Sequence, residues 1–263
     1  MEGSKRFLFI QDCSGVCTLL AYHLQRLGHE VKVMVADDVF GIYSYYKRKG
    51  VNVVFTKKGK RIIFNAIREA RKYDVVHVSS LDYLASILKT IYPKKTIILH
   101  YHGSDFRGKE YEKWKYCLLP DFVLVSTPDM LDPELGYYLA YLPAPVDTEL
   151  FKNYNSERED VAVYFRLNYE DEKRAIDRAK GVINVPVRVL ERKFKYHELP
   201  ILFNKIKYFI DRYSIKSLSK TALEALACGC KVVNYKGEVV EKLPNYHKPE
   251  FVVESYLRLI EES

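Results

Sequence analysis

Short runs of strand-forming residues alternate with segments of helical periodicity along the sequence, and this alternation constrains the fold most. In the first half, apolar β-branched runs are each followed by a turn or by a segment with apolar residues at three- and four-residue spacing. The pattern predicts an α/β protein with parallel sheets of βαβ units, whose first half is a doubly wound domain. The runs are 7–10, 31–35, 51–55, 75–78, 96–100 and 122–125, and the helical segments are 16–27, 61–72 and 81–91.

The second half repeats this alternation on a smaller scale after the segment Pro143-Ala-Pro145. The end of the chain begins with Pro249 and carries an apolar stripe, so we expect a capping helix there. The sequence therefore predicts two domains, residues 1–145 and 146–263. The expected strands of the second lie near 161–165, 185–190, 207–210 and 231–234, and its helices near 170–180, 198–204 and 218–228.

Residues 217–233 combine a polar turn, a short amphipathic helix, a glycine stop and a buried strand. Ser217, Ser219 and Thr221 crowd the expected helix start, where backbone N–H groups and the positive end of the helix dipole favour a phosphate. Glu224 lies one to two turns into the helix, where it can accept hydrogen bonds from a sugar diol. The segment therefore predicts a nucleotide site.

Several segments resemble, in the same order, those of nucleotide-sugar glycosyltransferases of the GT-B fold, family 4-like. The segment TALEALACGCKVV resembles the LEAMAxGxPVV signature, and DCSGVCTLLAYHLQRLGHEVKVMV resembles the family's first loop, helix and strand. The segments YDVVHVSS, HYHGSDFR, PDFVLVSTPDM and PAPVDTELF resemble DVVHVH, HGxD, ADxVIxVS and PNGVDTERF. The resemblance covers the whole chain. It implies two Rossmann-like domains with a cleft between them and a C-terminal helix near the domain junction.

The resemblance also implies which groups hold the donor. Arg166 and Lys173 match an Arg and a Lys that bind the diphosphate, although the loop is two residues longer and Phe165 replaces a glycine. Two cations there would neutralise a diphosphate without a metal. The alternative is that both are solvated surface charges. The predicted donor-binding residues are Gly15, Arg166, Lys173, Lys216, Ser217, Leu218, Ser219, Thr221 and Glu224.

Glu224 corresponds to the second glutamate of the family's E-x7-E motif, which implies a contact to the ribose. Lys216 stands in place of the first glutamate, which usually contacts the transferred sugar. Lys216 could add to neutralisation of the diphosphate, pair with an acidic sugar, mark an inactive descendant or be an exposed structural lysine. The sequence leaves these alternatives open.

The first domain is expected to supply the other wall of the cleft, because ligands bind beyond the carboxyl ends of parallel strands. Gly15 would let backbone N–H groups approach the ligand, or would serve only a tight turn. His102 resembles the family residue that lines the donor-sugar pocket. We predict His102 and Asp105 as catalytic, His102 stabilising an oxocarbenium-like transition state and Asp105 orienting the loop or the acceptor. The alternative is a capped loop with a hydrogen-bonded histidine, and a packed histidine is equally expected at His77.

Motifs of other enzyme classes are missing from the sequence. It has no Asp-x-Asp metal motif, no G-x-S-x-G and no G-x-G-x-x-G after the first strand, so we predict no metal and no cofactor, and disfavour an oxidoreductase. Five cysteines without a C-x-x-C pair indicate a reduced, cytosolic interior. No apolar run reaches the roughly 20 residues that span a bilayer, and no signal-peptide pattern starts the chain.

A basic and aromatic segment in the first half contains Tyr43, Tyr45 and Tyr46. Together with a net charge of +8, it suggests an anionic membrane surface as a partner, with the tyrosines at the interface. A solvated charge run is the alternative, and nucleic acid is not expected because no such motif is present. The cations of the segment are Lys47, Arg48, Lys49, Lys57, Lys58, Lys60 and Arg61.

These observations predict a glycosyltransferase that moves a hexose from a UDP- or GDP-linked sugar to a glycan or lipid-linked acceptor. The resemblance implies a retaining, metal-independent reaction in the cytoplasm or on the inner face of the membrane. The alternative is a non-catalytic subunit that binds a nucleotide sugar, as Lys216 and the short second domain permit.

Overall fold

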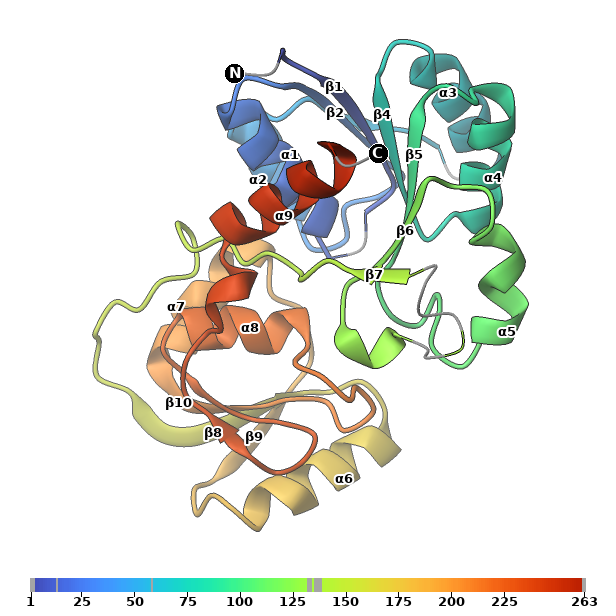
Figure 1. Cartoon of the computed structure of the whole chain (residues 1–263). Coiled ribbons are helices and arrows are strands. Elements are labelled where there is room, and N and C mark those ends of the chain that lie inside the picture. Colours follow the sequence, from blue (N-terminus) through green and yellow to red (C-terminus); the bar gives the residue numbers. More distant parts are fainter. Residues whose placement is uncertain (1–2, 13, 58, 132–133, 135–138, 262–263) are drawn as a thin grey trace. The chain divides into compact units, whose positions relative to one another are not determined.

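The computed structural model describes residues 3–12, 14–57, 59–131, 134 and 139–261 (Figure 1). The chain forms two compact units: Met1–Pro145 together with Pro249–Ser263, and Val146–Lys248. The contacts divide the chain after Pro145 and again before Pro249. The last helix was expected in the second domain, whereas its contacts group it with the first unit.

The first unit contains a parallel seven-stranded sheet of order β3-β2-β1-β4-β5-β6-β7. Strands β1 and β4 are neighbours from which the connections leave in opposite directions, and such a switch point is where open α/β sheets bind ligands. The strands are β1 (Arg6–Ile10), β2 (Glu30–Val35), β3 (Val53–Phe55), β4 (Val75–Ser79), β5 (Thr96–Tyr101), β6 (Phe122–Val125) and β7 (Leu139–Tyr141).

Helices cover both faces of this sheet, so its strands are apolar on both sides (Figure 1). Leu8 and Ile10 of β1 belong to one core cluster with residues of α3 and α4. Phe7 and Phe9 point to the other face, where their rings lie 6.2 and 6.3 Å from that of Tyr256 in α9. The helices are α1 (Val16–Arg26), α2 (Ile42–Arg48), α3 (Lys60–Ala70), α4 (Asp82–Ile91), α5 (Glu110–Lys113) and α9 (Pro249–Glu261).

The second unit contains a five-stranded sheet of order β12-β11-β10-β8-β9, in which β12 is antiparallel to β11. Its order also reverses beside the first strand, between β8 and β10. Ala162, Tyr164 and Ile210 pack against Ala175 and Ala179 in a core cluster. The elements are β8 (Glu159–Phe165), α6 (Tyr169–Lys180), β9 (Val187–Leu190), α7 (Leu199–Lys205), β10 (Ile206–Ile210), α8 (Lys220–Ala227), β11 (Lys231–Val233) and β12 (Val239–Val240).

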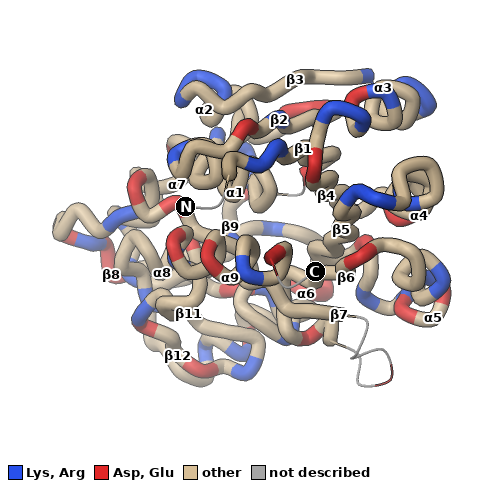
Figure 2. Tube along the Cα trace, turned by 45° about the horizontal axis from the view of Figure 1, so that its top comes forward, with Lys and Arg blue, Asp and Glu red and all other residues tan. Residues whose placement is uncertain are grey.

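The basic, aromatic segment spans α2, β3 and the start of α3. Tyr43 and Tyr46 are buried in α2, 8% and 0% exposed, because α2 packs against α1 and β3. The prediction that these tyrosines meet a membrane is therefore wrong. The exposed cations of α2 and of the start of α3 remain on the surface (Figure 2), and Lys58 lies outside the described residues. No described helix has the length and apolar character needed to cross a bilayer.

Candidate functional site

The carboxyl edge of the second sheet brings together two of the predicted donor residues, Ser219 and Thr221. Strands β8 and β10 end side by side at the switch point, and the loop after β10 leads into α8. Parallel strands place the residues that follow them at the same edge, which is where ligands of open α/β sheets bind. A small pocket lies there, lined by Tyr164, Phe165, Arg192, Phe209, Ile210, Asp211, Arg212, Ser219 and Thr221.

Asp211 holds the loop between β10 and α8. Its carboxylate accepts hydrogen bonds from the backbone N–H groups of Ser219 and Arg212, both at 2.8 Å. Burial raises the pKa of Asp211, and the hydrogen bonds from Ser219 oppose that shift. Ser219 is the N-cap of α8, and its hydroxyl accepts from the N–H of Ala222 at 3.2 Å. One of the N–H groups at the helix start is therefore already bound.

Two arginines line this pocket, and the sequence resemblance did not point to either. Arg212 forms no ion pair with a carboxylate in the described part of the chain, so its guanidinium can pair with an anionic ligand. Arg192 follows β9, and burial lowers its pKa while the charge of Glu224 opposes that effect. A half-buried guanidinium can bind a phosphate through two parallel N–H groups, but at Arg192 the phosphate would compete with Glu224 for the positive charge.

Glu224 is only 2% exposed and lies within the unit's interior. Its carboxylate is 3.5 Å from the ammonium of Lys220, one helical turn earlier, whose side chain is 10% exposed. Burial raises the pKa of Glu224, and the cations of Lys220 and Arg192 oppose this shift. A ribose contact from Glu224, as predicted, would have to share the carboxylate with Lys220.

The remaining predicted donor residues of this unit are not gathered at the pocket. Arg166 follows β8, but its guanidinium binds Glu172 at 2.8 Å and Glu191 at 3.1 Å, and half of the side chain is exposed. Lys173 and Lys216 are exposed, while Ser217 and Leu218 are half-buried in the loop before the Ser219 cap. None of these five residues lines the described pocket.

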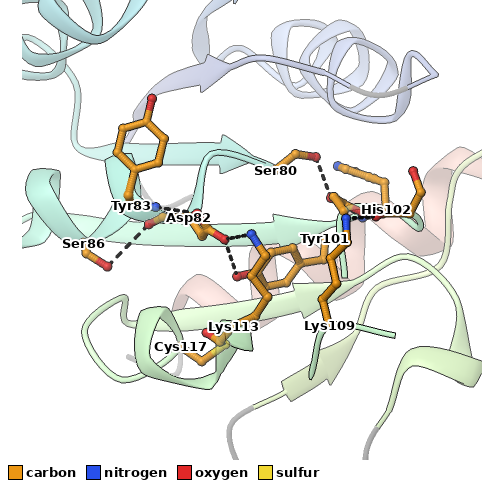
Figure 3. A network of polar contacts seen from close by, with 11 residues as sticks. Ser80, Asp82, Tyr83, Ser86, Tyr101, His102, Lys109, Lys113 and Cys117 are labelled. Carbon is orange, nitrogen blue, oxygen red and sulfur yellow. Dashed lines mark hydrogen bonds and ion pairs between the residues drawn. The ribbon is translucent and has the colours of Figure 1, made fainter. Parts of the chain in front are cut away.

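In the first unit, Asp105 orders the loop that carries His102, and Figure 3 shows His102 together with Ser80. Its carboxylate accepts from the N–H of Gly103 at 2.6 Å, from the N–H of His102 at 3.1 Å and from the hydroxyl of Ser80 at 2.6 Å. Both oxygens thus serve the loop. The arrangement matches the capped-loop alternative for Asp105, which fixes the backbone of His102.

His102 is the end of a hydrogen-bonded chain of side chains that starts at the last helix. Tyr256 of α9 bonds to Nδ1 of His77 at 2.9 Å, and Nε2 of His77 lies 3.1 Å from Nδ1 of His100. Nε2 of His100 bonds to Ser126 at 2.9 Å, and Ser126 bonds to Nδ1 of His102 at 2.7 Å. We call these five groups the relay.

Part of the relay lies beside a thiol. Ligand-type atoms of Cys17, His77 and His100, all buried, come within 4.8 Å of one another. The thiol of Cys17 also lies 3.1 Å from the hydroxyl of Ser79. Three such groups are a set that zinc accepts, but both histidines have hydrogen-bond partners on both ring nitrogens.

Gly15 is explained by the local backbone. Its φ is +75°, and a Cβ atom there would lie 2.6 Å from Ile42 of α2. The N–H groups of Cys17 and Thr18 at the start of α1 donate to the carboxylate of Asp12, at 3.1 and 2.9 Å. The tight-turn alternative accounts for the glycine, and Asp12 occupies the N–H groups that a ligand would use.

Sequence reasoning missed Arg192, Asp211 and Arg212, although a signal for them existed. All three follow directly, or within two residues, the end of a predicted strand. The rule that ligands bind beyond the carboxyl ends of strands would have selected them. Ser126 also follows a strand, β6. Nothing in the sequence pattern indicates that Tyr256 is connected to Ser126 through His77 and His100.

Comparison with known proteins gives a likeness in structure alone. No family model matches the chain, and no curated protein matches it in sequence. A glycosyltransferase from Rickettsia africae ESF-5 is similar in structure, with a TM-score of 0.64 and 11% identity over 98% of this chain and 89% of that one. The glycotransferase of kitacinnamycin has a TM-score of 0.51 and 12% identity, over 97% and 85%. The chain therefore has the two-domain α/β fold of GT-B proteins.

Proposed function

We propose that the chain, which has a glycosyltransferase-like fold, binds a nucleoside diphosphate sugar and transfers its sugar to a hydroxyl acceptor. The pocket at the switch point of the second sheet, about 10 Å³ in volume, holds no more than a water-sized group, so the observation that carries the proposal is the set of hydrogen-bond donors around it. It combines the start of α8 with Arg192 and Arg212, and no described carboxylate pairs with Arg212. A diphosphate supplies the negative charge that this set of donors suits.

In the proposed reaction, the bond between the anomeric carbon and the β-phosphate oxygen breaks, and its electron pair leaves with the nucleoside diphosphate. The acceptor hydroxyl forms the new bond to that carbon on the same face, and its proton passes to the departing phosphate. Arg192 and Arg212 stabilise the charge that develops on the leaving group, a task that needs no metal. Glu224 is the proposed ribose contact, and His102 the proposed contact to the sugar.

The binding step is tested by calorimetry of the chain with UDP, GDP and ADP, each with and without a metal chelator. We expect one nucleotide to bind in both conditions. Arg212→Ala should weaken that binding roughly tenfold or more, because a charge-assisted hydrogen bond contributes about 1.5–3 kcal/mol. Transfer is then measured with sugar conjugates of the nucleotide that binds.

Arg188→Ala is the matched control for Arg212→Ala, since it also removes one arginine side chain from the second unit, in this case from β9. Arg188 does not line the described pocket and pairs with Glu159 at 2.6 Å. Its binding constant should equal that of the wild type. If no nucleotide binds, or if both variants bind equally, the pocket is not the donor site.

For the acceptor, we propose a glycan or lipid-linked precursor at the cytoplasmic face of a membrane. The exposed cations Lys47, Arg48, Lys49, Lys60 and Arg61 support this proposal, because they can meet anionic headgroups. Cosedimentation should then occur with anionic vesicles and not with neutral ones. Equal binding to both vesicle types, or to neither, would contradict it.

A further inference from the structure

We infer that Tyr256 of α9 acts through the relay to hold His102 with its proton on Nε2, so that Nε2 of His102 can donate a hydrogen bond but cannot act as a general base. Tyr256 is in this sense a positioning residue for His102. The role of the donor in the transfer reaction rests on the proposed function, whereas the tautomer itself does not.

The inner relay members keep fixed protonation states. His77 and His100 are 1% and 0% exposed. Burial lowers the pKa of His77 to about 3 and the pKa of His100 well below its usual range, and a second proton on the ring of His102 would lower both further. Each ring is therefore neutral at physiological pH, with one nitrogen donating and the other accepting. Burial also raises the pKa of Tyr256, which keeps its proton.

The direction of the relay follows from its inner end. The hydroxyl of Tyr256 is completely buried, and a buried O–H needs an acceptor. Within the described ranges, Nδ1 of His77 is the acceptor that lies within hydrogen-bond distance of it. Tyr256 therefore donates to Nδ1 of His77, and the proton of His77 resides on Nε2.

Each later contact then has one direction. Nε2 of His77 donates to Nδ1 of His100, so the proton of His100 is on Nε2 and is donated to the oxygen of Ser126. The hydroxyl of Ser126 has a single proton, which it donates to Nδ1 of His102. Because Nδ1 of His102 accepts, its ring proton is on Nε2. The reverse direction would leave the Tyr256 proton without an acceptor.

The tautomer is measured in the ligand-free protein by the ¹⁵N shifts of the imidazole nitrogens in long-range ¹H–¹⁵N spectra. The protonated and unprotonated ring nitrogens are well separated there. We expect Nε2–H for His102 in the wild type. Tyr256→Phe removes the donor to His77 and should shift the tautomer ratio of His102 roughly tenfold towards Nδ1–H.

Two further variants separate the relay from a general effect on the fold. Ser126→Ala should shift the ratio in the same direction, whereas Ser126→Thr keeps the hydroxyl and should retain Nε2–H. Tyr92→Phe removes a tyrosine hydroxyl that bonds to the carbonyl of Ile67, outside the relay, and should leave His102 unchanged.

Three results would overturn the inference. They are an Nδ1–H tautomer of His102 in the wild type, an unchanged ratio in Tyr256→Phe, and stoichiometric zinc in the purified protein. Zinc held by Cys17, His77 and His100 would use the nitrogen lone pairs that the relay commits to hydrogen bonds. Since none of these measurements needs a nucleotide, failure of the proposed function would leave the tautomer result standing. If transfer is observed, Tyr256→Phe should lower kcat with little change in the KM of the donor.

Discussion

Asp171 ties the turn before α8 to α6. Its carboxylate accepts from the hydroxyl of Tyr164 at 2.7 Å and from the N–H groups of Ser214 and Tyr213 at 2.7 and 3.3 Å. Asp171→Asn turns one acceptor oxygen into a donor that faces these donors. We expect the free energy of unfolding of the second unit to fall by about 1–3 kcal/mol, measured by urea unfolding at pH 7.

The effect of Asp171 should also depend on pH. Burial alone would raise the pKa of Asp171, but hydrogen bonds from Ser214 and Tyr164 outweigh it and hold the pKa below its usual range. Its stabilisation is therefore present above the pKa of the unfolded chain and is lost as pH falls through the folded value. The difference between wild type and Asp171→Asn should shrink in acid. Asp177→Asn, at an exposed position of α6, is the control and should change neither the free energy of unfolding nor its dependence on pH. An equal loss of stability in Asp171→Asn and Asp177→Asn would refute the prediction.

Single side chains were the least predictable part of the candidate site. Arg166 matches a motif, yet two glutamates bind it, because a surface guanidinium takes whichever carboxylates its loop brings near. The Lys220–Glu224 pair could have been predicted from its four-residue spacing. The approach of Arg192 to Glu224 could not, since it depends on how the loop after β9 packs against α8.

Strands β4 and β5 carry two buried histidines, which makes the stability of the first unit depend on pH. In the unfolded chain His77 and His100 take up protons near pH 6.5. In the folded chain burial lowers the pKa of His77 to about 3 and the pKa of His100 well below its usual range, so both stay unprotonated at pH 5–6. Below pH 6.5 the unfolded state thus binds more protons than the folded state. The stability of the first unit therefore decreases as the pH decreases. The two residues should contribute roughly 2.7 kcal/mol per pH unit at pH 5–6.

His77→Gln should reduce this slope by about 1.4 kcal/mol per pH unit, whatever its effect on stability at pH 7. The slope is measured by urea unfolding at several pH values, with the fluorescence of Trp114, the single tryptophan of the chain, as the signal. The control is His197→Gln, because His197 is exposed in the second unit. An unchanged slope in His77→Gln would mean that the histidine is protonated in the folded state.

Most elements of both sheets are confirmed as predicted, because central strands such as β1, β4 and β5 are buried on two faces and their apolar runs stand out from the polar turns. The exceptions are short. Helix α2 was interpreted as a surface because its tyrosines adjoin a run of cations, and only packing against α1 and β3 reveals which side is buried. Strand β7 and helix α5 have three and four residues, too few for a periodic pattern.

The first unit needs its C-terminal segment for a complete core. Tyr256 is fully buried against Phe7 and Phe9, whereas Phe251 on the same helix is 45% exposed. Tyr256→Ala should lower the stability of the first unit by about 3–5 kcal/mol, the usual cost of removing a buried aromatic ring. Hydrogen exchange followed by mass spectrometry measures this loss separately in peptides of each unit.

Phe251→Ala is the control for Tyr256→Ala and should change stability by less than about 0.5 kcal/mol. In Tyr256→Ala, peptides of β1 and β4 should exchange faster, whereas those of β8 and β10 should not. Faster exchange confined to the second unit would contradict the grouping of Pro249–Ser263 with the first.

The sequence predicted this helix but not the unit to which it belongs. Its apolar stripe fits any complementary apolar surface, so periodicity cannot choose between two sheets. The choice depends on tertiary partners, namely the aromatic rings of β1 and the contact of α9 with α1.

The return of α9 has a consequence for the order of events on the ribosome. Domains are generally expected to fold from the N-terminal end as they emerge. Here the first unit lacks part of its core until Pro249–Glu261 has been translated, after all of the second unit. At about 5–20 residues per second, the second unit alone takes on the order of ten seconds to synthesise. During that interval Phe7, Phe9 and His77 lack the helix that buries them, so the first unit is completed only after the second.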